Sequence, residues 1–259
     1  MKLRQIILIS ACLLAGVAFA QGHNDTIKVM TFNLHAGRDA SLQQIGHLIK
    51  QYQPDFVALQ EVDQNTHRSN CPYQNNRDFI AELAFYSGME GLYGPTIKFG
   101  GGHYGIGLLT RHQFVDVHNI KLPHPVARME QRGLLEGTFI LPDGDTIMFA
   151  CTHFEAFDSV SRAAQAQFIY NHFADSQFPV ILAGDFNAPP DDPVIGLLTS
   201  QWLDCTSGDF TFSVKKPKEK IDYIFARPIR SWRTIESQVI PVEMSDHYPV
   251  IATLVVSRD

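Results

Sequence analysis

The chain has 259 residues, of which 45% are hydrophobic and 19% charged, and this composition is typical of a globular protein. It shows no internal repeat and no low-complexity block, which excludes solenoid and disordered architectures. Its formal net charge of −6 argues against a protein that holds nucleic acid through non-specific phosphate contacts, although a small basic pocket is compatible with it.

The N-terminal residues 1–20 have the pattern of a signal peptide. Lys2 and Arg4 precede a short apolar run, and Ala18-Phe19-Ala20 supplies a small-residue cleavage site. We therefore expect a secreted or periplasmic protein after cleavage near Ala20, with no transmembrane segment in the mature chain. A lipoprotein cleavage site at Cys12 is the alternative, and it is disfavoured because the apolar core before Cys12 would be very short.

Short runs rich in β-branched and aromatic residues predict strands along the rest of the chain. In chain order they cover residues 27–32, 55–60, 106–110, 134–141, 146–152, 179–184, 221–226 and 248–256. Helices are predicted between some of them, over residues 41–52, 77–88 and 159–173. The first helix begins after a Ser41 cap and places apolar side chains on one face, namely Leu42, Ile45, Leu48 and Ile49.

Two glycine-containing stretches predict connections between strands. LPDGDT (141–146) is typical of a tight hairpin turn. KFGGGHYGIG (98–107) is either a second hairpin or a flexible loop over a pocket, and the hairpin is favoured. Hairpins mixed with helical crossovers predict an α/β sandwich with mixed sheets. Because no linker-like stretch divides the chain, residues 21–259 are expected to form one domain.

Polar side chains stand where several of the predicted strands end or begin. These residues are Asn33, Glu61, His153, Asp185, Asn187, Asp222, Asp246 and His247. Each of them alone has an ordinary explanation, because Asp and Asn are frequent turn formers and a single histidine is often structural. In layered α/β folds, however, functional sites gather where strand ends meet, because rigid elements hold side chains there. The whole set therefore predicts one site.

The oxygen-bearing members of this set suit a divalent cation. Mg²⁺ takes oxygen ligands and keeps several waters, so one or two carboxylates are enough to hold it. Glu61 is the first candidate ligand, followed by Asp246 and the amide oxygen of Asn33. A bound Mg²⁺, or Mn²⁺ in its place, would polarise a phosphoryl oxygen and offset the charge of a transition state.

The remaining members suit the activation of water and the binding of phosphate. A histidine with a pKa near neutrality, held by a carboxylate, can take a proton from water, and His247 with Asp222 fits this role. Asp185 would hold the water or help to deprotonate it. Asn187 and His153 would donate hydrogen bonds to phosphate oxygens.

Seven motifs give the chain a resemblance to a known family. In order they are TFNLHAG, PDFVALQEVD, GIGLLTRH, THF, GDFNAPP, KIDYIF and SDHYPV, spread from about residue 27 to 256. The sequence resembles the endonuclease/exonuclease/phosphatase superfamily, whose DNase I-like fold implies a four-layer α/β/β/α sandwich of two packed mixed sheets. The resemblance implies the same roles for the site residues: Asn33, Glu61 and Asp246 at the metal, Asp185 and Asn187 at the water and phosphate, Asp222 paired with His247, and His153 as the phosphate-side histidine.

The chain also departs from the nuclease members of that superfamily. Many of them carry an acid two residues after the asparagine, where this chain has His35, so a second metal ligand of the nuclease type is in doubt. QEVDQNTHRSNC and RGLLEGTF resemble a secreted or periplasmic branch of hydrolases. His35, Arg38, Arg68 and Arg132 are candidate substrate-binding residues. The three arginines could grip a phosphate through a bidentate guanidinium, but a solvated surface charge is the favoured explanation for each arginine.

These observations predict a Mg²⁺- or Mn²⁺-dependent phosphoesterase that uses an activated water on a small or lipid-derived phosphodiester. The acidic net charge favours such a substrate, and a secreted nuclease acting on DNA or RNA is the alternative. A binding protein that has lost the chemistry is disfavoured because the full set of site residues is present. A zinc hydrolase is disfavoured because neither an HExxH nor a CxxC pair occurs. We expect a monomer.

Three cysteines follow the predicted signal peptide. Cys151 lies in an apolar run and is expected to be a buried free thiol. Cys71 and Cys205 could form a disulfide in an oxidising compartment, but their spacing leaves this open.

Overall fold

The computed structural model describes residues 26–256 of the chain. The predicted signal peptide, its cleavage site and Cys12 lie outside the described residues. Within the described part, no helix combines the length and the apolar character that a bilayer crossing needs.

The described chain contains twelve strands and four α-helices. The strands are β1 (Thr26–Asn33), β2 (Phe56–Gln64), β3 (Glu90–Phe99), β4 (Gly102–Thr110), β5 (Gln113–Lys121), β6 (Gly133–Ile140), β7 (Thr146–His153), β8 (Val180–Asp185), β9 (Leu203–Asp204), β10 (Asp222–Arg227), β11 (Trp232–Val239) and β12 (Val250–Val256). The helices are α1 (Leu42–Tyr52), α2 (Phe79–Ser87), α3 (Ser159–His172) and α4 (Pro193–Thr199). All the predicted strands and helices are present, with ends shifted by a few residues.

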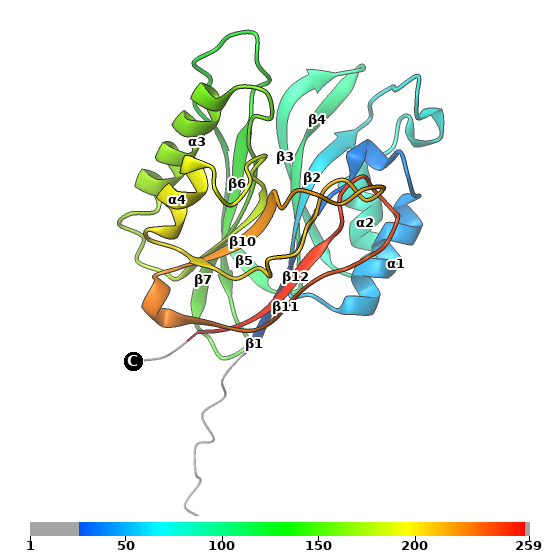
Figure 1. Cartoon of the computed structure of the whole chain (residues 1–259). Coiled ribbons are helices and arrows are strands. Elements are labelled where there is room, and N and C mark those ends of the chain that lie inside the picture. The colour runs from blue at the N-terminus through cyan, green and yellow to red at the C-terminus, as the bar shows by residue number, and fades with distance from the viewer. Residues whose placement is uncertain (1–25, 257–259) are drawn as a thin grey trace, which may run out of the picture.

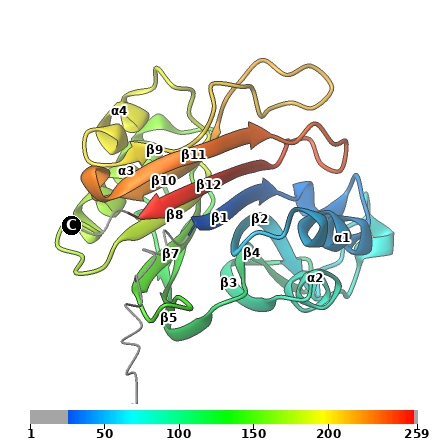
Figure 2. The same cartoon turned by 90° about the horizontal axis from the view of Figure 1, so that it is seen from below.

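The strands form two six-stranded mixed sheets. Their orders are β11-β12-β1-β2-β4-β3 and β5-β6-β7-β8-β10-β9. Helices α1 and α2 cover the outer face of the first sheet, while α3 and α4 cover the second (Figures 1 and 2). The predicted four-layer sandwich of the DNase I-like fold is therefore confirmed.

Both faces of the central strands are buried, which explains their nearly continuous apolar sequences. In β1, Ile27 and Val29 face the core between the sheets, whereas Met30 and Phe32 pack under α1 and α2. Between the sheets, the ring of Phe56 lies 5.0 Å from that of Phe139, centroid to centroid. Each such fully buried aromatic side chain stabilises the fold by about 2–3 kcal/mol.

Local signals fix the ends of the elements. Ser41 accepts a hydrogen bond from the main chain of Gln44 and completes a capping box at α1, as expected from its position. The KFGGGHYGIG stretch forms the β3–β4 hairpin that was favoured, with Gly100 and Gly101 at positive φ in its turn. LPDGDT likewise joins β6 to β7, with Gly144 at a φ of +92°.

The three cysteines of the described chain are buried free thiols. Cys151 was predicted to be one, and this is confirmed. A bridge between Cys71 and Cys205 is not formed: Cys205 packs in the core between the sheets, whereas Cys71 contacts the main-chain oxygen of Gly37.

The pairing of the strands brings the predicted site residues to one end of the sandwich. Parallel pairing of β1 with β2 sets Asn33 level with Gln60, next to Glu61. Parallel pairing of β7 with β8 sets His153 level with Asp185. Antiparallel β10 then places Asp222 opposite Asp185.

Candidate active site

The strand ends of the two sheets surround a pocket of about 460 Å³. Seven of the predicted site residues line it: Glu61, Arg132, His153, Asp185, Asn187, Asp246 and His247. Asn33 and Asp222 are each 1% exposed and contact the lining residues from behind. One cavity therefore collects side chains that lie up to 186 positions apart, from Glu61 to His247.

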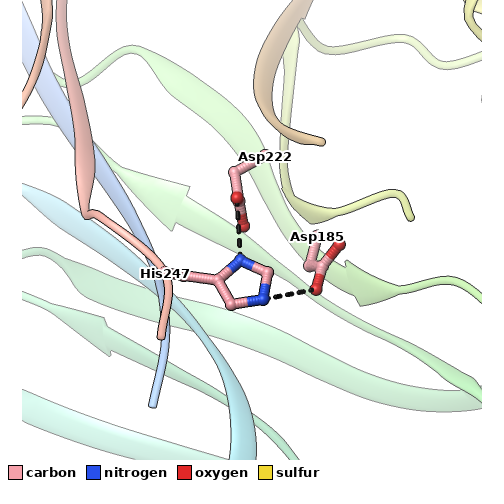
Figure 3. Close-up of side chains that lie close together, drawn as sticks. All are labelled: Asp185, Asp222 and His247. Atoms are coloured by element: carbon pink, nitrogen blue, oxygen red, sulfur yellow. Dashed lines mark hydrogen bonds and ion pairs between the residues drawn. The ribbon is translucent and has the colours of Figure 1, made fainter. Parts of the chain in front are cut away.

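His247 lies between two carboxylates, as Figure 3 shows. Its Nδ1 is 2.9 Å from Asp222 Oδ2, and its Nε2 is 3.7 Å from Asp185 Oδ2. The ring of Phe212 packs against the imidazole at a centroid distance of 4.8 Å. The predicted pairing of His247 with Asp222 is thus present in the structure.

These buried charges shift one another's pKa values. Burial would lower the pKa of His247, but Asp222, Asp185 and Asp246 outweigh it and raise that pKa to about 10. Burial, together with repulsion from Asp222, raises the pKa of Asp185 to about 7. Without a cation this pKa lies above the near-neutral value expected from the sequence, because the number of surrounding carboxylates cannot be read from the motif.

Asn33 connects the carboxylates of the two sheets. Its Nδ2 donates to Asp185 Oδ2 at 3.0 Å and lies 3.4 Å from Glu61 Oε1. Its amide oxygen accepts a hydrogen bond from the main-chain N–H of His35 at 3.0 Å. Asn33 therefore presents a donor to the two carboxylates here, whereas the sequence suggested an oxygen ligand.

The side chain of Glu61 is directed by a β-bulge. The register of β2 with β4 shifts between Leu59 and Val62, and Glu61 has a φ of 56°. A bulge re-aims a side chain, and a left-handed conformation costs a non-glycine residue on the order of 1 kcal/mol. The backbone is therefore strained at Glu61, the residue whose side chain lines the pocket.

The acidic groups of the pocket fit a hard divalent cation. Glu61 and Asp246 both line the cavity, and carboxylate oxygens are the ligands such ions prefer. Asp185, Asp222 and His247 also offer ligand atoms within 4.8 Å of one another. In the last group, Nδ1 of His247 is already hydrogen-bonded to Asp222.

Asn187 lies two residues beyond Asp185 and turns the chain at a φ of 48°. Its main-chain N–H donates to Asp185 Oδ1 at 2.9 Å and fixes that carboxylate. Its side-chain amide donates to the carbonyl oxygen of Phe154 at 3.0 Å. The residue thus supports Asp185 as well as lining the pocket.

His153 has a guanidinium as its neighbour. Nη1 of Arg132 lies 3.1 Å from His153 Nδ1, and His153 Nε2 lies 3.4 Å from Asp185 Oδ2. Burial, with the nearby charges of Arg132 and His247, lowers the pKa of His153 well below its usual value. The favoured explanation of Arg132 as a solvated surface charge was therefore wrong.

The other predicted phosphate-gripping residues lie outside the pocket lining. His35 Nδ1 is 2.6 Å from Asp39 Oδ2, and Arg38 Nη1 is 2.8 Å from His35 Nε2. Arg68 makes a bidentate pair with the buried Asp63 and lies over the ring of Phe99. Arg68 is thus neither a solvated charge nor a lining residue, because its guanidinium is already engaged by both carboxylate oxygens of Asp63.

Sequence reasoning missed three polar residues of the pocket wall, Tyr104, Glu130 and Glu219. Burial raises the pKa of Glu130 despite the nearby Arg132, and it raises that of Tyr104 strongly. Glu130 lies in the segment before β6, where neither a strand end nor a motif marks it. Only its position two residues before Arg132, in MEQR, could have indicated that it belongs to the site.

Comparison with known sequences and structures gives one family. The sequence profile of the Endonuclease/Exonuclease/phosphatase family matches residues 30–247, a range that runs from just before Asn33 to His247. Nocturnin from Rattus norvegicus is 25% identical over 172 residues, which are 60% of this chain and 38% of that protein. The match thus covers well under half the length of this curated relative.

Solved structures with the same fold share about one residue in five with this chain. The endonuclease/exonuclease/phosphatase from Beutenbergia cavernae superposes with a TM-score of 0.76 at 21% identity, over 90% of this chain and 72% of that chain. The mannosyl-6-phosphatase of Bacteroides thetaiotaomicron gives a TM-score of 0.71 at 18% identity, over 88% of this chain and 99% of that chain. At these identities the similarity shows the fold alone.

Proposed function

The chain belongs to the endonuclease/exonuclease/phosphatase family, and from this premise we propose that it is a Mg²⁺- or Mn²⁺-dependent phosphoesterase. Its proposed substrate is a small or lipid-derived phosphodiester, which an activated water attacks in line. One observation carries the proposal: Glu61 and Asp246 line the same pocket as the hydrogen-bonded Asp222–His247 pair and Asp185. A cation site and a proton acceptor therefore face one reacting centre.

The cation would be held by Glu61 and Asp246. When bound, it would polarise a phosphoryl oxygen and stabilise the charge that develops during P–O cleavage. Added positive charge beside His247 would also lower the pKa of that imidazole from about 10 towards neutrality, because like charges disfavour its protonated form.

Asp185 and His247 would share the work of deprotonating water. Asp185, with a pKa of about 7, is partly ionised at neutral pH and lies within 3.7 Å of His247 Nε2. The water transfers a proton to this pair while its oxygen bonds to phosphorus, and the leaving oxygen departs with the electrons of the broken P–O bond. Asp222 holds His247 through Nδ1, and Asn33 holds Asp185.

The apolar part of the pocket lining supports an organic leaving group. Ala156, Phe157, Pro189 and Ile221 contribute apolar surface to the lining. A cavity of about 460 Å³ with both polar and apolar lining residues is of the size that binds small molecules. The acidic Glu130, Glu219 and Asp246 at the same cavity disfavour the polyanionic backbone of DNA or RNA, which was the alternative substrate.

We also propose, from the signal-peptide pattern of residues 1–20, that the enzyme acts outside the cytoplasm, and that it acts as a monomer. The name of the mannosyl-6-phosphatase neighbour describes a sugar phosphomonoester as substrate. Monoesters therefore belong beside diesters in any substrate test of this chain.

The test is a panel of phosphodiesters, phosphomonoesters and phospholipids assayed with Mg²⁺, Mn²⁺ or EDTA. We expect hydrolysis of a small diester that stops on chelation and returns with either ion. Glu61→Gln should lose this activity, while Glu236→Gln on the exposed edge strand β11 should keep it. Activity that survives full chelation would overturn the proposed mechanism.

A further inference from the structure

The two histidines of the pocket have opposite kinds of neighbour at Nδ1. His247 faces a carboxylate, Asp222, at 2.9 Å. His153 faces the guanidinium of Arg132, whose Nη1 lies 3.1 Å away. Both imidazoles are only 5% exposed, so the groups that touch them strongly influence where each ring carries its protons.

The chemistry of arginine fixes the direction of the second hydrogen bond. A guanidinium has five N–H donors, no acceptor, and stays protonated in proteins. Arg132 is 7% exposed, and Asp185, Glu130 and Glu155 surround it, which favours its charged form further. The bond can therefore run only from Arg132 Nη1 to a lone pair on His153 Nδ1.

An accepting lone pair on Nδ1 determines which nitrogen of the His153 ring carries the proton. A neutral imidazole whose Nδ1 accepts must carry its proton on Nε2. That nitrogen lies 3.4 Å from Asp185 Oδ2, and both residues line the pocket. An imidazolium would point an N–H at the guanidinium inside the protein, where two like charges cannot both be accommodated.

We propose that Arg132 is a positioning residue that locks His153 as the neutral Nε2–H tautomer, so that His153 presents a hydrogen-bond donor to the substrate. This proposal rests on the proposed function, because the acceptor would be a phosphoryl oxygen. In this proposal, the group that contacts Nδ1 of each histidine determines the role of that histidine. The carboxylate partner makes His247 the proton acceptor, and the guanidinium partner makes His153 a donor that takes up no proton.

Arg132 is itself held in place on both sides. Its Nη1 lies 2.8 Å from Glu130 Oε1, and its Nε lies 3.5 Å from Glu155 Oε2. Glu155 Oε1 also accepts the main-chain N–H of Phe157, so the loop that follows His153 is tied to the same group. The guanidinium is thus fixed relative to β7 before any substrate enters.

The tautomer is measured directly by long-range ¹H–¹⁵N NMR of the histidine rings in the full-length, EDTA-treated protein at neutral pH. The His153 signals are assigned by their loss in His153→Gln, and the exposed His103 serves as an internal reference. We expect His153 to show the Nε2–H pattern. An Nδ1–H or imidazolium pattern in the unmodified protein would overturn the proposal, without any variant having to fold.

Two substitutions separate positioning from direct binding. Arg132→Met removes the donor and should release His153 into a mixture of tautomers, with kcat lowered about 10- to 100-fold and KM little changed, as for other groups that orient a functional side chain. Arg132→Lys keeps a donor and should retain the tautomer and restore most of kcat.

If Arg132→Met leaves the tautomer unchanged and raises KM instead, Arg132 binds the substrate and the positioning role is wrong. If the unmodified protein is inactive on every ester while His153 shows the Nε2–H pattern, the proposed function fails and the tautomer lock stands.

Discussion

At the scale of single residues, the most consequential feature is the burial of His247 between Asp222 and Asp185. The folded-state pKa of about 10 lies above the usual value of 6.5. A group of this kind contributes stability that is fully present below its unfolded pKa and is lost as the pH rises through its folded pKa. Here that window runs from about pH 6.5 to about pH 10.

We therefore expect His247→Gln to lower the free energy of unfolding by about 3 kcal/mol at pH 7, because it leaves buried carboxylates without their cation. The deficit should shrink towards pH 10, where the parent protein loses the same interaction. Urea denaturation across this range measures it, with the exposed His103→Gln as control. A deficit that stays constant with pH would contradict the charged state of His247. Turnover should be lost in His247→Gln at every pH.

The residues that the sequence could identify are those with a fixed relation to a strand. Glu61, His153 and Asp185 were found because each follows an apolar run, and the run itself showed where the side chain would emerge. Arg132 was named but misjudged, because a loop residue shows no partner until the fold brings it beside His153. The pKa of His247 could not be predicted for the same reason, since its shift balances burial, which lowers it, against three carboxylates, two of which, Asp222 and Asp185, lie far away in the sequence.

At the scale of elements, the strands missed from the sequence, β3, β5, β9 and β11, are the edge strands of the two sheets. Most of β5 is exposed, and β11 is also an outer strand with several exposed residues, so neither shows the continuous apolar run that marked β1 or β8. In β3, Gly94 and Pro95 interrupt the pattern, although Pro95 sits at a register shift in an edge strand, where proline is tolerated. Helix α4 is short and begins with a proline, and a short segment that begins with proline is also typical of a turn.

The close approach of β7 and β8 gives a prediction for Gly184, the residue before Asp185. A Cβ at Gly184 would lie 2.1 Å from the carbonyl oxygen of Thr152, which belongs to the rigid neighbouring strand. Gly184→Ala should therefore force the strands apart, lower the free energy of unfolding by about 1–3 kcal/mol and displace Asp185. A misplacement of about 1 Å can lower activity on the order of 100-fold.

Urea denaturation and steady-state kinetics measure these two effects. Gly196→Ala is the matched control, because nothing lies within 4 Å of its added Cβ, and alanine favours the helix α4 by about 0.5–1 kcal/mol. A Gly184→Ala protein that is as stable and as active as the parent would show that the β7–β8 spacing does not set the site.

At the scale of the whole molecule, the site depends on two sheets that meet face to face. The first sheet supplies Asn33 and Glu61, and the second supplies His153, Asp185 and Asp222. The hydrogen bond of Asn33 to Asp185 crosses between the sheets, and so does that of Gln60 to Cys151. Formation of the pocket is thus coupled to the packing of the sandwich, and neither half holds the proposed chemistry alone.

The steepness of the salt dependence separates a small-ester hydrolase from a nuclease, and the net charge of −6 favours the former. A protein that neutralises several phosphates loses about 10³- to 10⁵-fold in affinity between 50 and 200 mM salt. We expect kcat/KM for a small diester to change less than about 3-fold over that range, because the pocket contacts a single phosphate. Nicking of supercoiled plasmid should be slow at both concentrations.

The exposed Lys215, Lys216 and Lys218 lie on the segment between Phe212 and Glu219, two lining residues of the pocket. If nicking is fast, falls steeply with salt and is lost when these three are changed to Gln, the substrate is nucleic acid.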